Sequence, residues 1–258
     1  MIAKLRLFLF ISLCLCSTYS VLAQKKVKLE RADKQQGGKF ADGQRYDSWT
    51  GDVVFSHQTT RIKCDSAIRM NKTNVIEAFG HVHIKEGDSV TVTSRKLIYD
   101  GNTQMAKLRD GVVFSKLDQV TLYTDFLDYD RIKQLAYYYN NGKLVDSTNT
   151  LSSRKGYYQV NTNTASFKKN VVVVNPDYTL KSDTLQYNTT SNIMFFRATT
   201  ELTDGDGNVF NYSEGEYDTS KKKSAFDKGI LETESYNLVG DKLYLDDIRK
   251  YYKATSNV

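Results

Sequence analysis

The amino-acid sequence predicts an all-β protein built from stacked antiparallel strand pairs, and three observations lead to that prediction. The 258 residues include 18 Tyr and only 1 Pro. Tyrosine fits the half-buried pleated surface of a sheet, whereas proline removes a ladder donor and is excluded from central strands. Apolar and polar residues alternate with a period of two, as where Val82 and Ile84 alternate with His81 and His83. The third observation is a repeat of about thirty residues.

The repeat is defined by a small residue, a polar pair, and an apolar–x–aromatic step that ends in Asp or Asn. Its clearest copies are Ser94–Asp100, Thr124–Asp130 and Ser182–Asn188. A period this regular predicts a stack of similar strand units. The positions that mark the period lie 28 to 30 residues apart and are Tyr99, Tyr129, Tyr158, Tyr187, Tyr217 and Leu245.

A second landmark lies between these copies, where a turn-forming residue precedes an alternating apolar run. Gly80 precedes Val82, and Asp110–Gly111 precedes Val112 in the same way. Such residues are typical of a strand that follows a tight turn. The pattern therefore predicts two short strands in each repeat.

The chain divides into three segments. Lys4 and Arg6 precede a short apolar run, which predicts a signal peptide over residues 1–23, cleaved between Ala23 and Gln24. Residues 24–47 are polar and are predicted to form a flexible lead-in. Residues 48–258 are predicted to form the repeat domain, with about seven two-strand repeats of which the last is incomplete.

No catalytic residue, metal site or cofactor is predicted. His81 and His83 could face one ligand, but no further metal-binding side chains lie at suitable spacing. The recurring carboxylates are spread along the chain at the repeat period, whereas acid–base catalysis needs two brought together. Cys64 would be the one cysteine left after signal cleavage, and it is predicted to be a buried hydrophobe. The mild net charge of +6 does not favour a nucleic-acid partner.

The order of these motifs resembles the OstA-like (organic solvent tolerance) family. The residues that carry the resemblance are the Leu97–Asp100 step, the turn after it, and runs such as Ala78–Ile84; it extends from Trp49 to Val258. That family includes LptA-type lipopolysaccharide-transport proteins and the N-terminal domain of the LptD-type translocon. The resemblance implies an OstA-like β-jelly-roll of V-shaped strand pairs with an apolar interior. It also implies a periplasmic carrier, associated with outer-membrane assembly, that bridges other transport components and has no enzymatic activity.

The resemblance and the alternation together predict where lipid A would bind. Acyl chains would lie in an apolar trough, and Arg or Lys side chains on its rim would pair with the phosphates. The predicted trough residues are Val82, Ile84, Leu97, Tyr99, Val112, Phe114, Leu127, Tyr129, Val171, Val173, Leu185 and Tyr187. The predicted rim residues are Arg95, Lys96, Arg154, Lys155, Lys168 and Lys169.

Two departures from the repeat bear on the interior, because Gly156 and Gly215 stand where larger residues are expected. The interior is predicted to narrow or open at those levels. At the C-terminal end, Gly240–Tyr252 carries little that would block an open sheet edge, which predicts β-edge pairing with a like-folded component or head-to-tail self-association.

Two alternatives to a lipid carrier remain at this point. One is an exported structural or adhesive β-solenoid whose apolar face is a filled core, and the other is a polysaccharide-active β-helix enzyme. An open trough would favour the carrier, and a dry, packed interior would favour the scaffold.

Overall fold

The computed structural model describes residues 26–70, 73–117, 119–235, 237–246, 248–249 and 251–255. The predicted signal peptide, residues 1–23, lies outside the described residues. Within them, 20 strands form one sheet in which every pairing is antiparallel, so the predicted all-β class is confirmed.

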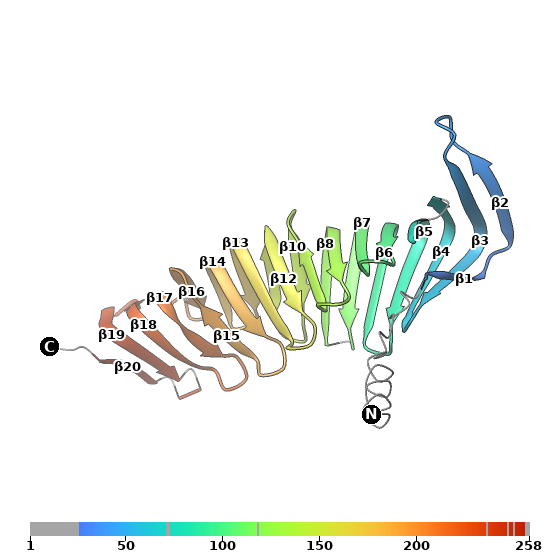
Figure 1. The fold of residues 1–258 in the computed structure, drawn as a ribbon. Coiled ribbons are helices and arrows are strands. Elements are labelled where there is room, and N and C mark those ends of the chain that lie inside the picture. Colours follow the sequence, from blue (N-terminus) through green and yellow to red (C-terminus); the bar gives the residue numbers. More distant parts are fainter. Residues whose placement is uncertain are drawn as a thin grey trace, which may run out of the picture.

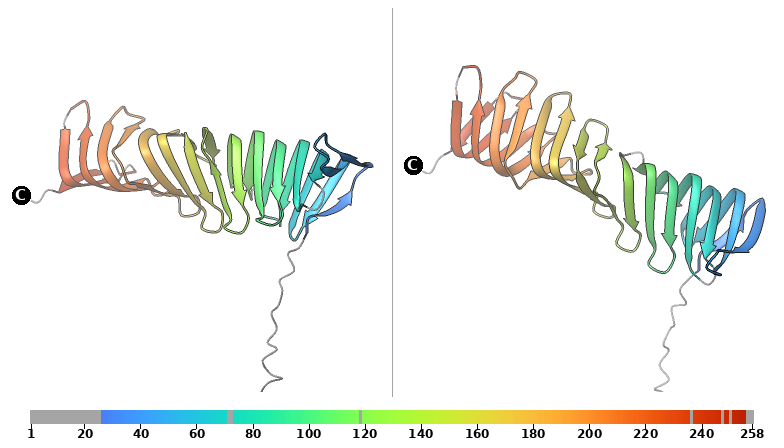
Figure 2. Two further views of the ribbon diagram at one scale, coloured as in Figure 1. Left: turned by 45° about the horizontal axis from the view of Figure 1, so that its top comes forward. Right: turned by 90° about the horizontal axis from the view of Figure 1, so that it is seen from above.

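The strands follow one another along a single long axis, from β3 near one end to β20 at the other (Figures 1 and 2). The strands are β1 (Lys28–Arg31), β2 (Lys34–Lys39), β3 (Arg45–His57), β4 (Thr60–Met70), β5 (Val75–Glu86), β6 (Val90–Asp100), β7 (Met105–Lys116), β8 (Val120–Asp130), β9 (Leu135–Tyr138), β10 (Gly142–Val145), β11 (Thr150–Ser153), β12 (Lys155–Gln159), β13 (Thr164–Asn175), β14 (Tyr178–Asn188), β15 (Ile193–Phe196), β16 (Thr200–Asp204), β17 (Val209–Asp218), β18 (Lys223–Glu232), β19 (Asn237–Asp246) and β20 (Tyr251–Thr255).

The long strands bend in the middle, so that each contributes to two arms. In β5, Val75–Phe79 pairs with one part of β6 and Val82–Glu86 with another, and the register shifts between them. We call the layer that contains Val75–Phe79 arm A and the layer that contains Val82–Glu86 arm B. The two arms meet at the bend, which gives each strand the V shape expected for stacked strand pairs.

The second sequence landmark marks this bend and not a turn between two strands. Gly80 and His81 have φ of 71° and 38°, and Asp110–Gly111 and Lys169–Asn170 also lie in the left-handed region. Each thirty-residue repeat here does hold two strands, such as β5 with β6, but the prediction that a strand begins at this landmark was wrong, because β5, β7 and β13 each run through it. The bulges here use backbone with positive φ, as several kinds of tight turn do, so the same residue types mark both.

The first landmark supplies a hydroxyl group at the same bend. Ser94 Oγ donates to the carbonyl of Lys96 at 2.9 Å, and Ser153 Oγ donates to that of Lys155 at 2.7 Å. Ser182 Oγ makes the equivalent bond to the carbonyl of Thr184 at 3.0 Å. A bend interrupts the ladder of backbone hydrogen bonds. A small hydroxyl side chain there donates to a carbonyl that has lost its ladder partner. This role explains why the repeat keeps a small polar residue at that position.

Three levels of the stack replace one bent strand by two short ones. β8 pairs with β9 on arm A and with β10 on arm B. The pairs β11 with β12 and β15 with β16 divide in the same way. The break falls at the bend in each case, so both arms remain continuous along the stack.

The predicted flexible lead-in, residues 24–47, contains β1, β2 and the start of β3, so the prediction was wrong for its described part. β2 pairs with β3 from Lys34 opposite Thr50 to Lys39 opposite Arg45. Its sequence, KQQGGK, has no apolar alternation. Ladder hydrogen bonds to β3 make it a strand, and single-sequence patterns do not reveal such a partner.

Aromatic rings fill the levels where glycine stands in the interior. A Cβ on Gly142 would lie 2.5 Å from the Tyr138 ring, and one on Gly156 would lie 2.4 Å from it. The Tyr138 hydroxyl is hydrogen-bonded to Ser153 Oγ at 2.8 Å. A Cβ on Gly215 would lie 2.6 Å from the Phe226 ring. The interior is therefore occupied at both levels.

Gly156→Ala should destabilise the protein because the new methyl group would overlap the Tyr138 ring. We expect a loss of about 1–3 kcal/mol in the free energy of unfolding, measured by urea titration. Gly37→Ala is the matched control, because its nearest neighbour would lie 3.8 Å away. Equal free energies of unfolding for the two variants would contradict the predicted overlap between a methyl group at residue 156 and the Tyr138 ring.

Candidate functional site

The two arms enclose a continuous apolar interior. All twelve residues predicted for the trough point into it, and each is at most 3% exposed. They belong to one cluster of buried side chains that extends from Trp49 near one end of the stack to Leu245 near the other. The prediction of which alternate residues face the interior is therefore confirmed. Contact of these residues with lipid stays a prediction.

The interior face of arm A is a ladder in which tyrosine alternates with alanine. Tyr129 lies between Ala106 and Ala136 in the strand register, and Tyr158 lies between Ala136 and Ala165. Large and small side chains then interdigitate across neighbouring strands. The repeat thus uses one buried tyrosine every second strand. The ladder runs Tyr99, Ala106, Tyr129, Ala136, Tyr158, Ala165 and Tyr187.

The far ends of the arms approach each other opposite the bend, and we call this line of approach the mouth. Near β5, Arg131 donates from Nε to Glu86 Oε2 at 2.6 Å and from Nη2 to Glu86 Oε1 at 2.8 Å. Glu86 ends β5 on arm B, and Arg131 follows β8 on arm A. Arg131 Nη1 also donates to the Tyr99 hydroxyl at 3.0 Å. The same hydroxyl is hydrogen-bonded to His57 Nδ1 at 2.7 Å. This network closes the mouth at the N-terminal end.

The charges in this network stabilise each other. Burial by itself would raise the pKa of Glu86, but hydrogen bonds from Arg131 and Thr60 outweigh it and lower the pKa below its usual value. Burial raises the pKa of the Tyr99 hydroxyl, and burial together with nearby Glu86 raises the pKa of Tyr129 to about 12. The carboxylate is therefore charged and the two tyrosines are neutral at pH 7.

Three further contacts cross the mouth at intervals of about thirty residues along arm B, and we call the four contacts latches. Lys116 Nζ donates to the Val160 carbonyl and to Asn163 Oδ1. The Tyr187 hydroxyl donates to Asp146 Oδ2 at 2.7 Å, and Lys222 Nζ donates to Asp177 Oδ2 at 2.5 Å. Sequence patterns did not reveal the latches, because their partners lie 41 to 47 residues apart.

The latches differ in burial, and so in strength. The side chains of Arg131 and Glu86 are 6% and 22% exposed, whereas those of Lys222 and Asp177 are 43% and 57% exposed. Removing one partner of a buried ion pair costs about 3–5 kcal/mol, because the other charge is left unpaired. An exposed pair is worth about 0–1 kcal/mol. The mouth is held firmly near β5 and weakly near β14.

The six cations predicted for the rim lie at the bend, on the opposite edge from the mouth. Lys96 borders the register shift in β6, and Lys168 borders that in β13. Arg154 lies between β11 and β12, at a break in the same edge. They therefore lie away from the mouth, because the Ser–Arg–Lys landmark belongs to the bend. Phosphate binding by any of the six stays a prediction. They are Arg95, Lys96, Arg154, Lys155, Lys168 and Lys169.

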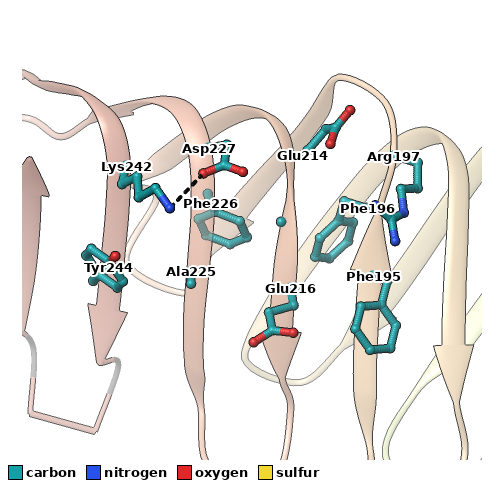
Figure 3. Close-up of a pocket in the computed structure, with 11 residues that line it drawn as sticks. Phe195, Phe196, Arg197, Glu214, Glu216, Ala225, Phe226, Asp227, Lys242 and Tyr244 are labelled. Carbon is teal, nitrogen blue, oxygen red and sulfur yellow. Dashed lines mark ion pairs between the residues drawn. The ribbon is translucent and has the colours of Figure 1, made fainter. Parts of the chain in front are cut away.

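A surface pocket of about 340 Å³ lies at the end of β15 and extends over β17, β18 and β19 (Figure 3). Phe195 and Tyr244 line it from opposite sides, and Lys242 forms an ion pair with Asp227 at 3.9 Å (Figure 3). Phe196 and Phe226, 1% and 2% exposed, belong to the core beneath it. The pocket is therefore a feature of the outer surface and not an opening into the interior.

Cys64 is 5% exposed, and burial raises the pKa of its thiol to about 12, so the predicted buried hydrophobe is confirmed. Among the described residues, no cluster of three or more His, Cys, Asp or Glu side chains is arranged to hold a metal ion. Nor does the described part contain a helix long and apolar enough to span a membrane.

A bent antiparallel sheet around a continuous apolar interior defines an elongated β-jelly-roll protein. Residues 24–183 match the family described as OstA-like protein, so the chain belongs to the OstA-like family. Membership supports a role in lipopolysaccharide transport in general. A comparison with curated proteins gave no match. Among solved structures, the chain is similar to LptH from Pseudomonas aeruginosa, an LptA-homologous periplasmic component of the lipopolysaccharide transport device. The identity is 17%, the TM-score is 0.25, and the match covers 52% of this chain and 79% of that chain.

Glu86→Gln should lower the free energy of unfolding by about 3 kcal/mol near pH 7, because Arg131 would lose its charged partner. The pKa of Glu86 is lowered in the folded protein, so its contribution is complete above its ordinary pKa of 4.5 and is lost as the pH falls through the folded value. The difference between wild type and variant should therefore narrow at about pH 3. Urea titrations at both pH values measure this.

Lys222→Gln is the matched control for an exposed latch. It should change stability by less than about 1 kcal/mol at either pH. If both variants were equally stable, the difference in latch strength along the mouth would be refuted.

Proposed function

We propose that the protein is a carrier that holds the acyl chains of lipopolysaccharide between its two arms during transport to the outer membrane. The observation that carries this proposal is the unbroken apolar interior that runs the length of the stack. Each methylene exposed to water costs about 0.8 kcal/mol, so a lipid in transit needs continuous apolar surroundings. Membership of the OstA-like family supports the same role.

The interior is packed, so an acyl chain has to part the arms. Backbone ladders join neighbouring strands along each arm, whereas the contacts that cross the mouth among the described residues are made by side chains. Opening the mouth therefore breaks latches and apolar contacts but leaves the ladders intact. Lipid tails then replace the apolar contacts that the two arms lose, which offsets much of the cost.

The packed interior is also what a structural or adhesive β-solenoid would have, so this second function stays in competition. A filled core stabilises a stack of repeats without any cargo. The two functions differ in whether lipid reaches the buried face. We assign no enzymatic activity to either.

The carrier is proposed to act in the periplasm, after cleavage of the signal peptide at Ala23, and to associate there with the outer membrane. Its partners would be like-folded transport components or further copies of itself. Among the described residues, β20 pairs with β19 alone, from Tyr251 opposite Asp246 to Thr255 opposite Lys242. The other side of β20 offers backbone donors and acceptors to a partner strand.

A photo-crosslinking residue at Phe114 should capture lipopolysaccharide, whereas one at Tyr123 should not. Phe114 is 1% exposed and faces the interior, while Tyr123 on the neighbouring strand is 45% exposed on the outer face of the same arm. Both variants replace an aromatic side chain by a benzophenone side chain, so the change in size is similar at the two positions. Captured lipid is measured by immunoblotting after irradiation in cells. Equal capture at both positions would refute the face assignment, and no capture at either would favour the scaffold.

Lys253→Pro should abolish concentration-dependent association through β20. Proline removes a backbone donor and cannot continue a sheet ladder. Lys253 is exposed and lies opposite Tyr244, so Lys253→Ala is a control that keeps the backbone donor. Sedimentation velocity over a concentration series measures the association. A wild-type protein that stays monomeric throughout, or equal association of both variants, would contradict pairing through this edge.

A further inference from the structure

Residues of the core line a hollow at the mouth between arm B and arm A, near the Lys222–Asp177 latch. The hollow has a volume of about 380 Å³ and lies among the turn at Asp177, the turn after Asp204, and Lys222. Its lining includes Tyr178, Leu202 and Tyr217, which are residues of the buried core. We call this hollow the port.

The port differs from the rest of the mouth in what lies on its floor. Leu202 and Tyr178 are 7% and 6% exposed, whereas Tyr99 and Val90 at the N-terminal end are 0% and 2% exposed. A larger hollow of about 550 Å³ near Asp146 is lined by Gln119, Asp146 and Asn192 and reaches the core only at Val120. Of these two hollows at the mouth, the port is the one whose floor is apolar and aromatic.

The ion pair over the port is more exposed than the Arg131–Glu86 pair. Lys222 and Asp177 are about half exposed, so water can replace their pairing at little cost. Below them, Tyr178 from arm B meets Tyr217 from arm A edge to face, with ring centroids 5.2 Å apart. Separating the two rings would join the port directly to the interior around Leu202.

We propose that the port is the site where a long acyl chain of a lipid passes into the interior, with the Lys222–Asp177 pair as a movable latch over it. This proposal rests on the proposed function and adds the place where the cargo crosses the mouth. Asp177, Asp204 and Asp206 surround the port with negative charge. Carboxylates disfavour a phosphate at this point, so the proposal concerns the acyl chain alone.

The test bridges the mouth at two places with a reducible reagent and measures the uptake of lipid. Cys64→Ala provides a cysteine-free mature background. Asp177→Cys with Lys222→Cys is bridged by a bis-methanethiosulfonate across the port. Thr59→Cys with Gln104→Cys is the control bridge, because both residues contact Arg131 from opposite arms and leave the Glu86 pair intact. Each protein is incubated with purified hexa-acyl lipid A, and bound lipid is counted by mass spectrometry before and after reduction.

We expect the bridge across the port to reduce bound lipid A to the blank level and reduction to restore it, while the control bridge leaves uptake unchanged. Uptake that persists with the port bridged would overturn the port and leave the carrier function standing. Equal blockage by both bridges would also overturn it, because the mouth would then have to open along its whole length. No uptake by the unbridged, folded protein would overturn the carrier function itself. Urea titration of each bridged protein verifies that it is folded.

Discussion

The left-handed bulge halfway along the strands is the constraint on which the rest of the molecule depends. Gly80 in β5 and Asp110–Gly111 in β7 place this bulge at the same height on the two strands that flank β6, so the bends align into one edge. One strand then supplies apolar residues to both arms, and the arms face each other across a shared core. Without the bend, the same alternation would give a flat sheet with an exposed apolar face.

Aligned bends make the molecule strong in one direction and weak in another. Along the stack, every level is joined to the next by backbone hydrogen bonds, which a ligand does not replace. Across the mouth, the arms are joined by side chains, and apolar contacts there can be exchanged for contacts with a lipid tail. The proposed carrier would admit its cargo between the arms in this way, while its sheet stays intact.

Tyrosine meets both requirements of the arm A interior. Its ring packs beside alanine on the adjacent strand, and its hydroxyl reaches the polar groups at the mouth, as Tyr99 does with Arg131 and Tyr187 with Asp146. Burial raises the pKa of both hydroxyl groups, so they remain neutral at physiological pH, where Tyr99 accepts from Arg131 and Tyr187 donates to Asp146. Phenylalanine would fill the same volume but would leave the latches without these hydrogen bonds.

The sequence by itself determined the all-β class, the period of about thirty residues and which alternate residues are buried. These properties depend on alternation and turn-forming residues that lie close together in the sequence. It did not determine that Gly80 marks a bend, since bulges and turns favour the same residue types. Nor did it place β2, whose polar strand depends on hydrogen bonds to β3. The tertiary structure alone decided that Arg95 and Lys96 lie at the bend and that Arg131 reaches Glu86 across the mouth. Those relations join residues from different repeats, and a periodic sequence gives no sign of which repeats will face each other.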